Sequence, residues 1–199
     1  MKNAKQKQRV HTQKLVLLAI LSAIVAVLAY YGGFIKIGGL ASISLTLIPV
    51  VIGATLMGPV AGAWLGAVAG LMFFATPDAT FWLGLSVPGT IITVMVKGIA
   101  SGLCAGFAYR LFERFNRYLA VVVSAIVCPV VNTGIFLLGS LLFFMEAVSG
   151  GAAKENVSVG MYLIVFFVGL NFLFELIVNI AVSPAIVRIL DITQKNRRR

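Results

Sequence analysis

The chain has 199 residues, of which 60% are hydrophobic and only 11% are charged, and its mean hydropathy is +1.04. Soluble domains are about 45–50% apolar and about 25% charged, so this composition excludes a soluble globular domain. Six spans of about 20 residues would use most of the length and leave no room for a separate ATPase or catalytic domain. We therefore predict a single all-α integral membrane domain, a bundle of six transmembrane helices.

Continuous apolar runs separated by turn signals define the predicted spans. In chain order they are residues 15–31, 41–57, 59–75, 88–109, 119–144 and 160–190. Only Gly58 separates the second span from the third, so these two are expected to form a helical hairpin. We expect loops at 76–87 and 146–158. The membrane domain then covers 15–190, between basic tails at 1–14 and 191–199.

Lysine and arginine are distributed unevenly between the two sides of these spans. Twelve of the sixteen lie in the tails and in the turn 110–118, and a thirteenth, Arg188, lies at the end of the last span beside the C-terminal tail. Two (Lys36 and Lys154) lie in the other loops, and Lys97 lies inside a span. Because basic residues mark the cytoplasmic side of a membrane protein, we expect both termini in the cytoplasm. These flanks also explain the net charge of +10. With no basic folded surface and no interleaved aromatics, nucleic-acid binding is not expected.

Two spans carry glycines at four-residue intervals. The glycines are Gly58, Gly62, Gly66 and Gly70 in the third span and Gly98, Gly102 and Gly106 in the fourth. Small residues at this spacing let helices approach closely inside a bilayer. The pattern predicts a tight bundle and carries no information about a substrate.

The residues needed for catalysis or metal binding at membrane depth are missing from the sequence. The only histidine, His11, lies in the N-terminal tail, and Cys104 and Cys128 lie in apolar runs. There is no P-loop, so ATP-driven work would need another polypeptide. We expect no enzyme activity, no metal site and no cofactor.

Polar groups inside the spans are the candidates for function, because ionisable groups are costly in a bilayer. The two ionisable ones are Lys97 and Glu175, and they are accompanied by Asn132, Asn171 and Asn179. The last span places Asn171, Glu175 and Asn179 on one helical face. At 1.5 Å per residue, Lys97, Asn132, Asn171 and Glu175 lie about 14 to 22 Å from the outer ends of their spans. Groups of both charges at a similar depth indicate the lining of a cavity.

Two interpretations of Lys97 remain open from the sequence. It could form an ion pair with Glu175 that merely joins two helices. Alternatively, it could meet the carboxylate or phosphate of a ligand in a water-filled pocket. A buried ion pair adds little net stability because desolvation offsets the attraction, which favours the pocket. Glu175 could neutralise Lys97 when such a pocket is empty.

Aromatic residues flank the first two outer loops. Most are expected to belong to the interfacial belt of a membrane protein. Some could close over a ligand, since the first loop is rich in glycine. We name Phe34 and Trp82 as candidates for this contact.

Short motifs in five of the spans, together with one longer stretch in the last, resemble a known family. They are Ala19-Ile-Leu-Ser-Ala23, Ser44-Leu-Thr-Leu-Ile-Pro49, Gly58-Pro-Val-Ala-Gly62, Lys97-Gly98, Pro129-Val-Val-Asn132-Thr133 and the stretch from Asn171 to Pro184. Their order and positions resemble those of the substrate-binding S-components of energy-coupling factor (ECF) vitamin transporters. The resemblance covers the whole membrane region.

The resemblance implies a mechanism and partners. Such proteins capture a vitamin outside the cell and associate with a transmembrane coupling protein and two cytosolic ATPases. Ala19 and Ala23 match the family's docking surface for the coupling protein. The implied location is the plasma membrane of a bacterium, with several passes through the bilayer.

The substrate class is less defined by the sequence. Lys97 favours a carboxylate-bearing ligand, and the amide groups suit hydroxyls and amides, a combination that pantothenate offers. Riboflavin, folate or another micronutrient is the alternative within the family. Outside it, the chain could be a stand-alone secondary transporter with Glu175 as its proton site, or a scaffold protein for a membrane complex.

Overall fold

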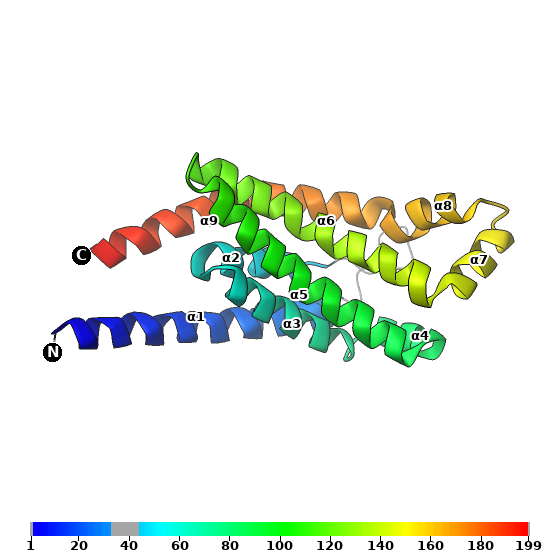
Figure 1. Ribbon diagram of the computed structural model, residues 1–199, viewed down its shortest axis with the longest axis horizontal. Coiled ribbons are helices and arrows are strands. Elements are labelled where there is room, and N and C mark those ends of the chain that lie inside the picture. Colours follow the sequence, from blue (N-terminus) through cyan, green and yellow to red (C-terminus); the bar gives the residue numbers. More distant parts are fainter. Residues whose placement is uncertain (1, 33–43, 199) are drawn as a thin grey trace.

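The computed structural model describes residues 2–32 and 44–198, and every regular element in these ranges is a helix. The predicted all-α class is therefore confirmed. Figure 1 shows an elongated bundle in which the beginning of α1 and the end of α9 lie at one end, and α4, α7 and α8 at the other. In chain order the elements are α1 (Lys2–Gly32), α2 (Leu47–Met57), α3 (Pro59–Phe73), α4 (Pro77–Leu85), α5 (Val87–Phe112), α6 (Arg117–Phe143), α7 (Met145–Lys154), α8 (Val159–Tyr162), the π-helix η1 (Leu163–Val168) and α9 (Gly169–Arg198).

Within the described residues, four helical segments are long and apolar enough to cross a membrane. They are Thr12–Gly32, Val87–Phe112, Arg117–Phe143 and Asn171–Ile192. Helices α3 and α4 add a fifth if the bent pair is counted as one span. Helix α2 has only 11 residues, which is about 16 Å of helix against a hydrocarbon core of about 30 Å. The structure thus supports four or five spans, and the count of six stays a prediction.

The segment 76–87, expected to be a loop, is largely helical, so that prediction was wrong. Helix α4 begins after the extended residue Thr76 with Pro77 in its first turn, a common helix start. It is bent by 83° from α3. Ala79 and Trp82 are buried, and this burial stabilises a helix that nine residues would not form alone.

The segment 146–158 was also predicted to be a loop, yet most of it forms α7. Its polar composition suggested a loop, but the buried residues Val148 and Ala152 lie one turn apart on a single face. That face packs in an apolar cluster that includes Trp82, Phe136 and Phe144. Tertiary packing therefore outweighs the polar composition of this segment.

The last predicted span, 160–190, is not one continuous helix. It is divided into α8, η1 and α9. Gly169, at the junction of η1 and α9, has a φ of +40°, which glycine adopts without a steric penalty. Within the described residues, the part of α9 that is long and apolar enough to cross a membrane is Asn171–Ile192. The face that carries Asn171, Glu175 and Asn179 lies in the N-terminal part of this helix.

The glycine stripes do pack two helices together, as the sequence predicted. A Cβ atom at Gly66 would meet the carbonyl oxygen of Gly98, and one at Gly102 would meet that of Gly62. Helices α3 and α5 are thus in backbone contact along their stripes. The hairpin turn is confirmed as well: Gly58 lies between α2 and α3 with a φ of +103°.

Two apolar clusters lie at different positions along the length of the bundle. The first includes Val50, Leu65, Ala125, Cys128 and Ile186. The second lies around Trp82 and joins residues of α4, α6, α7, α8 and η1. Along α6, Cys128 belongs to the first cluster and Phe136 to the second. The polar side chain of Asn132 lies between them, and this layer contains the cavity.

Candidate functional site

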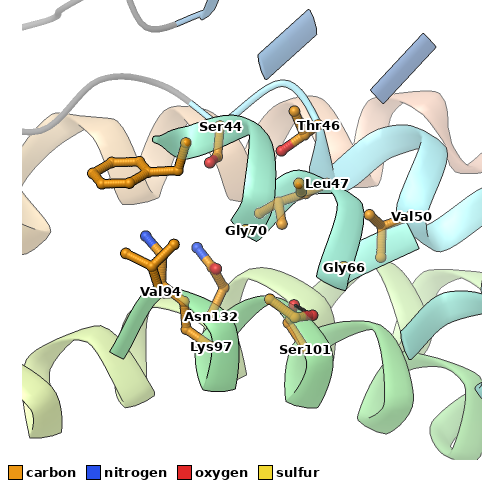
Figure 2. Close-up of a pocket in the computed structure, with 13 residues that line it drawn as sticks. Ser44, Thr46, Leu47, Val50, Gly66, Gly70, Val94, Lys97, Ser101 and Asn132 are labelled. Carbon is orange, nitrogen blue, oxygen red and sulfur yellow. Dashed lines mark hydrogen bonds between the residues drawn. The ribbon is translucent and has the colours of Figure 1, made fainter. Parts of the chain in front are cut away.

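A small cavity lies between α2, α3, α5 and α6, in the polar layer between the two apolar clusters. Its volume is about 50 Å³, enough for a few water molecules. Figure 2 shows Lys97 and Asn132 extending into this space from neighbouring helices, with Ser44 on the other side. The lining residues are Ser44, Thr46, Leu47, Val50, Gly66, Ala69, Gly70, Phe73, Val94, Lys97, Gly98, Ser101 and Asn132.

Lys97 reaches the cavity because α3 and α5 approach so closely. Gly66, Gly70 and Gly98 form part of the wall and have no side chains to fill the space. The half-buried Lys97 places its ammonium nitrogen 4.7 Å from the ring centroid of Phe136 and 5.7 Å from that of Phe73. Both distances lie within the range of a cation–π interaction.

Glu175 does not form the contact ion pair that the sequence left open. Its Oε1 atom accepts a hydrogen bond of 2.7 Å from the backbone N–H of Ser44. Among the described residues, no acidic side chain lies within ion-pair distance of Lys97. Glu175 is buried, with 7% of its surface exposed. Its carboxylate therefore holds a residue of the cavity wall, while Lys97 faces the cavity.

The three asparagines have different surroundings. Asn132 is buried and lines the cavity. Asn179 donates a hydrogen bond of 2.8 Å from Nδ2 to the carbonyl of Glu175, one turn back in α9. Asn171 is buried near the N-terminal end of α9. Of the α9 residues that the structure describes, none lines the cavity, so Asn171 and Asn179 are not brought to Lys97 there.

Of the two aromatic candidates, Trp82 and Phe34, only Trp82 lies in the described part of the chain. Trp82, on α4, does not line the cavity in the part of the chain that is described, but packs edge-to-face on Phe136 with ring centroids 5.2 Å apart. It thus supports the ring that contacts Lys97. Phe34 lies outside the described residues.

Three residues near the cation were not chosen as candidates from the sequence. Ser101 lies one turn from Lys97 on α5, and Phe136 lies one turn from Asn132 on α6, so each shares a helical face with a chosen residue. Ser44 was quoted in a motif but not assigned to the site. Its role depends on α9, which no local pattern relates to it.

Ala19 and Ala23 lie on the outer surface of α1, and both are exposed. Between them, Ser22 accepts a hydrogen bond of 3.2 Å from the indole nitrogen of Trp64 on α3. The alanine pair therefore lies on the exposed surface of α1, next to a hydrogen bond that joins α1 to α3.

The cavity combines a cation, an amide and hydroxyl groups, a set that binds a carboxylate together with hydroxyl or amide groups. Groups of three or more metal-ligating side chains are not found among the described residues.

Comparison with known proteins identifies the family of the chain. The family model described as "ECF transporter, substrate-specific component" matches residues 13–187, which includes every described residue of the cavity. No curated protein and no solved structure matches the chain. The family is one of transporter subunits that bind substrate, not of enzymes. The chain, a multi-pass membrane protein, therefore belongs to the family of substrate-specific components of ECF transporters.

Proposed function

We propose that this subunit captures a carboxylate-bearing vitamin, specifically pantothenate, for an ATP-driven importer. One observation carries the proposal: the ammonium group of Lys97 faces a cavity and has no contact carboxylate among the described residues. A cation at membrane depth without an ionic partner is costly, and an anionic ligand would compensate it.

The neighbouring groups suit the rest of such a molecule. The amide of Asn132 provides a donor and an acceptor, and Ser44 and Thr46 add hydroxyl groups at the opposite wall. Pantothenate contains a carboxylate, an amide and hydroxyls. Riboflavin lacks a carboxylate, and riboflavin and folate both carry extended ring systems, for which the cavity wall offers Phe73.

The cavity must widen to accept a ligand of this size. Binding sites for small molecules measure roughly 300–1,000 Å³, whereas this cavity measures about 50 Å³. We infer that capture displaces part of the wall. The segment from Ser44 to Leu47 is the candidate, because Glu175 is the only side chain found to hold it by a hydrogen bond among the described residues.

The proposal includes the partners and the orientation. Ala19 and Ala23 on the exposed face of α1 would contact a transmembrane coupling protein, since small residues one turn apart admit a second helix closely. Two cytosolic ATPases would supply the energy. With six crossings of a bacterial plasma membrane, both termini would be cytoplasmic, and the basic residues are distributed accordingly.

Isothermal titration of the purified full-length protein in nanodiscs tests the substrate. Pantothenate, riboflavin and folate are titrated in turn against the native chain, Lys97→Met and the control Lys154→Met, which removes an exposed lysine of α7. We expect pantothenate to bind the native chain and the control equally, and Lys97→Met to bind at least 100-fold more weakly, as for a lost charge-assisted contact. Equal binding by Lys97→Met would refute the proposed site.

Reconstitution separates an ATP-driven importer from a stand-alone transporter. Proteoliposomes containing only this chain should not accumulate labelled pantothenate, with or without a proton gradient. Accumulation driven by the gradient, and its loss in Glu175→Gln, would instead support the secondary transporter.

A further inference from the structure

The two charged groups nearest the cavity are each held by an uncharged partner. The ammonium of Lys97 lies over the ring of Phe136, and the carboxylate of Glu175 accepts a hydrogen bond from the backbone of Ser44. Glu175 is nevertheless near enough to attract Lys97 electrostatically, as is Asp78. The arrangement therefore keeps apart two groups that attract each other.

The ring of Phe136 is itself held in place. Phe136 is buried, with 9% of its surface exposed. Trp82 packs on it edge-to-face at 5.2 Å, and Phe144 packs on Trp82 at the same distance. The carbonyl of Trp82 accepts a hydrogen bond of 2.7 Å from the hydroxyl of Thr90 on α5. The ring thus presents a fixed face to the ammonium.

A fixed ring face matters because the lysine side chain is long and flexible. Without an attractive surface at this position, we expect the ammonium to move toward the carboxylate of Glu175, which attracts it. An ammonium paired with that carboxylate is less available to an anionic ligand, since the ligand must first compete with Glu175.

We propose that Phe136 is a positioning residue for ligand capture: its ring holds the Lys97 ammonium toward the cavity and away from Glu175. This inference rests on the proposed function, in which Lys97 binds the carboxylate of the ligand. Trp82 contributes indirectly by supporting the ring.

The test measures pantothenate affinity in nanodiscs for two substitutions of the ring. Phe136→Leu keeps an apolar side chain but removes the π face, and should bind about tenfold more weakly, the size expected for a partly desolvated cation–π contact. Phe136→Tyr keeps the π face and should remain within about twofold of the native chain.

A second comparison identifies Glu175 as the competitor. Glu175→Gln removes the charge but retains an oxygen that can accept from Ser44. Adding it to Phe136→Leu should restore most of the lost affinity, because the ammonium no longer has a carboxylate to pair with. A double variant as weak as Phe136→Leu alone would contradict this role.

Phe112→Leu is the control for packing. It removes a partly buried ring at the end of α5 that packs against the other apolar cluster, and no contact of this ring with Lys97, Phe136 or Trp82 is seen among the described residues. Its affinity should equal that of the native chain. If Phe112→Leu weakens binding as much as Phe136→Leu does, the effect is general packing and the proposal is wrong.

A measurement without ligand separates this inference from the proposed function. In protein labelled with ¹³C-lysine, the ε-methylene protons of Lys97, assigned with Lys97→Met, should resonate upfield because of the Phe136 ring current, and Phe136→Leu should remove this shift. If the shift is present but the native chain binds no vitamin, the proposed function fails and the ligand role of Phe136 fails with it. If pantothenate binds with equal affinity to the native chain and Phe136→Leu, only the inference fails.

Discussion

The backbone N–H of Ser44 donates a hydrogen bond of 2.7 Å to Oε1 of Glu175, joining two residues that are 131 positions apart. The bond connects the segment just before α2 with the N-terminal part of α9. Because Ser44 lines the cavity and Glu175 does not, the carboxylate shapes the cavity through the backbone. Glu175 would thus influence capture without touching the substrate.

We predict that Glu175→Ala lowers stability more than Glu175→Gln. The alanine leaves the N–H of Ser44 without its acceptor, which costs about 1–3 kcal/mol for a buried group, and because Ser44 is only partly buried the loss should lie near the lower end. The glutamine retains an acceptor. Thermal unfolding in nanodiscs measures both, with Glu146→Ala on the exposed face of α7 as the control. Equal midpoints for alanine and glutamine would show that the hydrogen bond contributes nothing.

We predict that Lys97→Met does not destabilise the protein. Methionine is of similar length and apolar, and Lys97 makes no contact ion pair among the described residues. Removing one partner of a true buried pair costs about 3–5 kcal/mol. The unfolding midpoint should therefore be unchanged or higher than that of the native chain, while binding is lost. A fall of the size expected for a broken ion pair would favour a purely structural role for Lys97.

Gly66→Ala should destabilise the bundle. The added methyl group would collide with the backbone carbonyl of Gly98, and overpacking of this kind costs about 1–3 kcal/mol. The matched control is Gly134→Ala on α6, where a Cβ meets nothing within 4 Å. That change should be neutral or stabilising by up to about 1 kcal/mol. Both are read from the free energy of unfolding, and a Gly66→Ala protein as stable as the control would rule out the close contact.

The ion pair between Arg117 and Asp191 should contribute little. The Nη1 atom of Arg117 and the Oδ1 atom of Asp191 are 2.6 Å apart, but the side chain of Arg117 is 34% exposed and that of Asp191 is 58% exposed. Exposed pairs are screened by solvent and are worth about 0–1 kcal/mol. We expect Asp191→Asn to lower the unfolding midpoint only slightly, and this shift should become smaller as the salt concentration is raised. Pantothenate affinity should be unchanged. A salt-independent loss of several degrees would contradict this expectation.

The orientation in the membrane can be tested by labelling single cysteines in a Cys104→Ala, Cys128→Ala background. Ser149→Cys in α7 and Arg114→Cys in the turn between α5 and α6 replace exposed residues. If both termini are cytoplasmic, a membrane-impermeant maleimide added to intact cells should label position 149 and spare position 114. The reverse pattern would invert the topology.

The sequence indicated part of the site because some of it is local. Lys97 and Asn132 could be chosen since polar side chains inside apolar spans stand out residue by residue. Phe136 could not, because a phenylalanine in an apolar span is ordinary until its ring is seen beneath an ammonium. Asn171 and Asn179 share the face of Glu175, as periodicity predicted, but that face contributes to the cavity only through Ser44.

Composition and spacing by themselves determined that the chain folds in a membrane as a tight helical bundle, because apolar runs and glycine stripes act within one helix or between any two close helices. Only the tertiary structure decided that Lys97 meets an aromatic ring and Glu175 meets a backbone amide. Those contacts depend on how each helix is rotated and where it is interrupted, as at Gly169. Such rotations are fixed by packing among distant segments, so no single stretch of sequence encodes them.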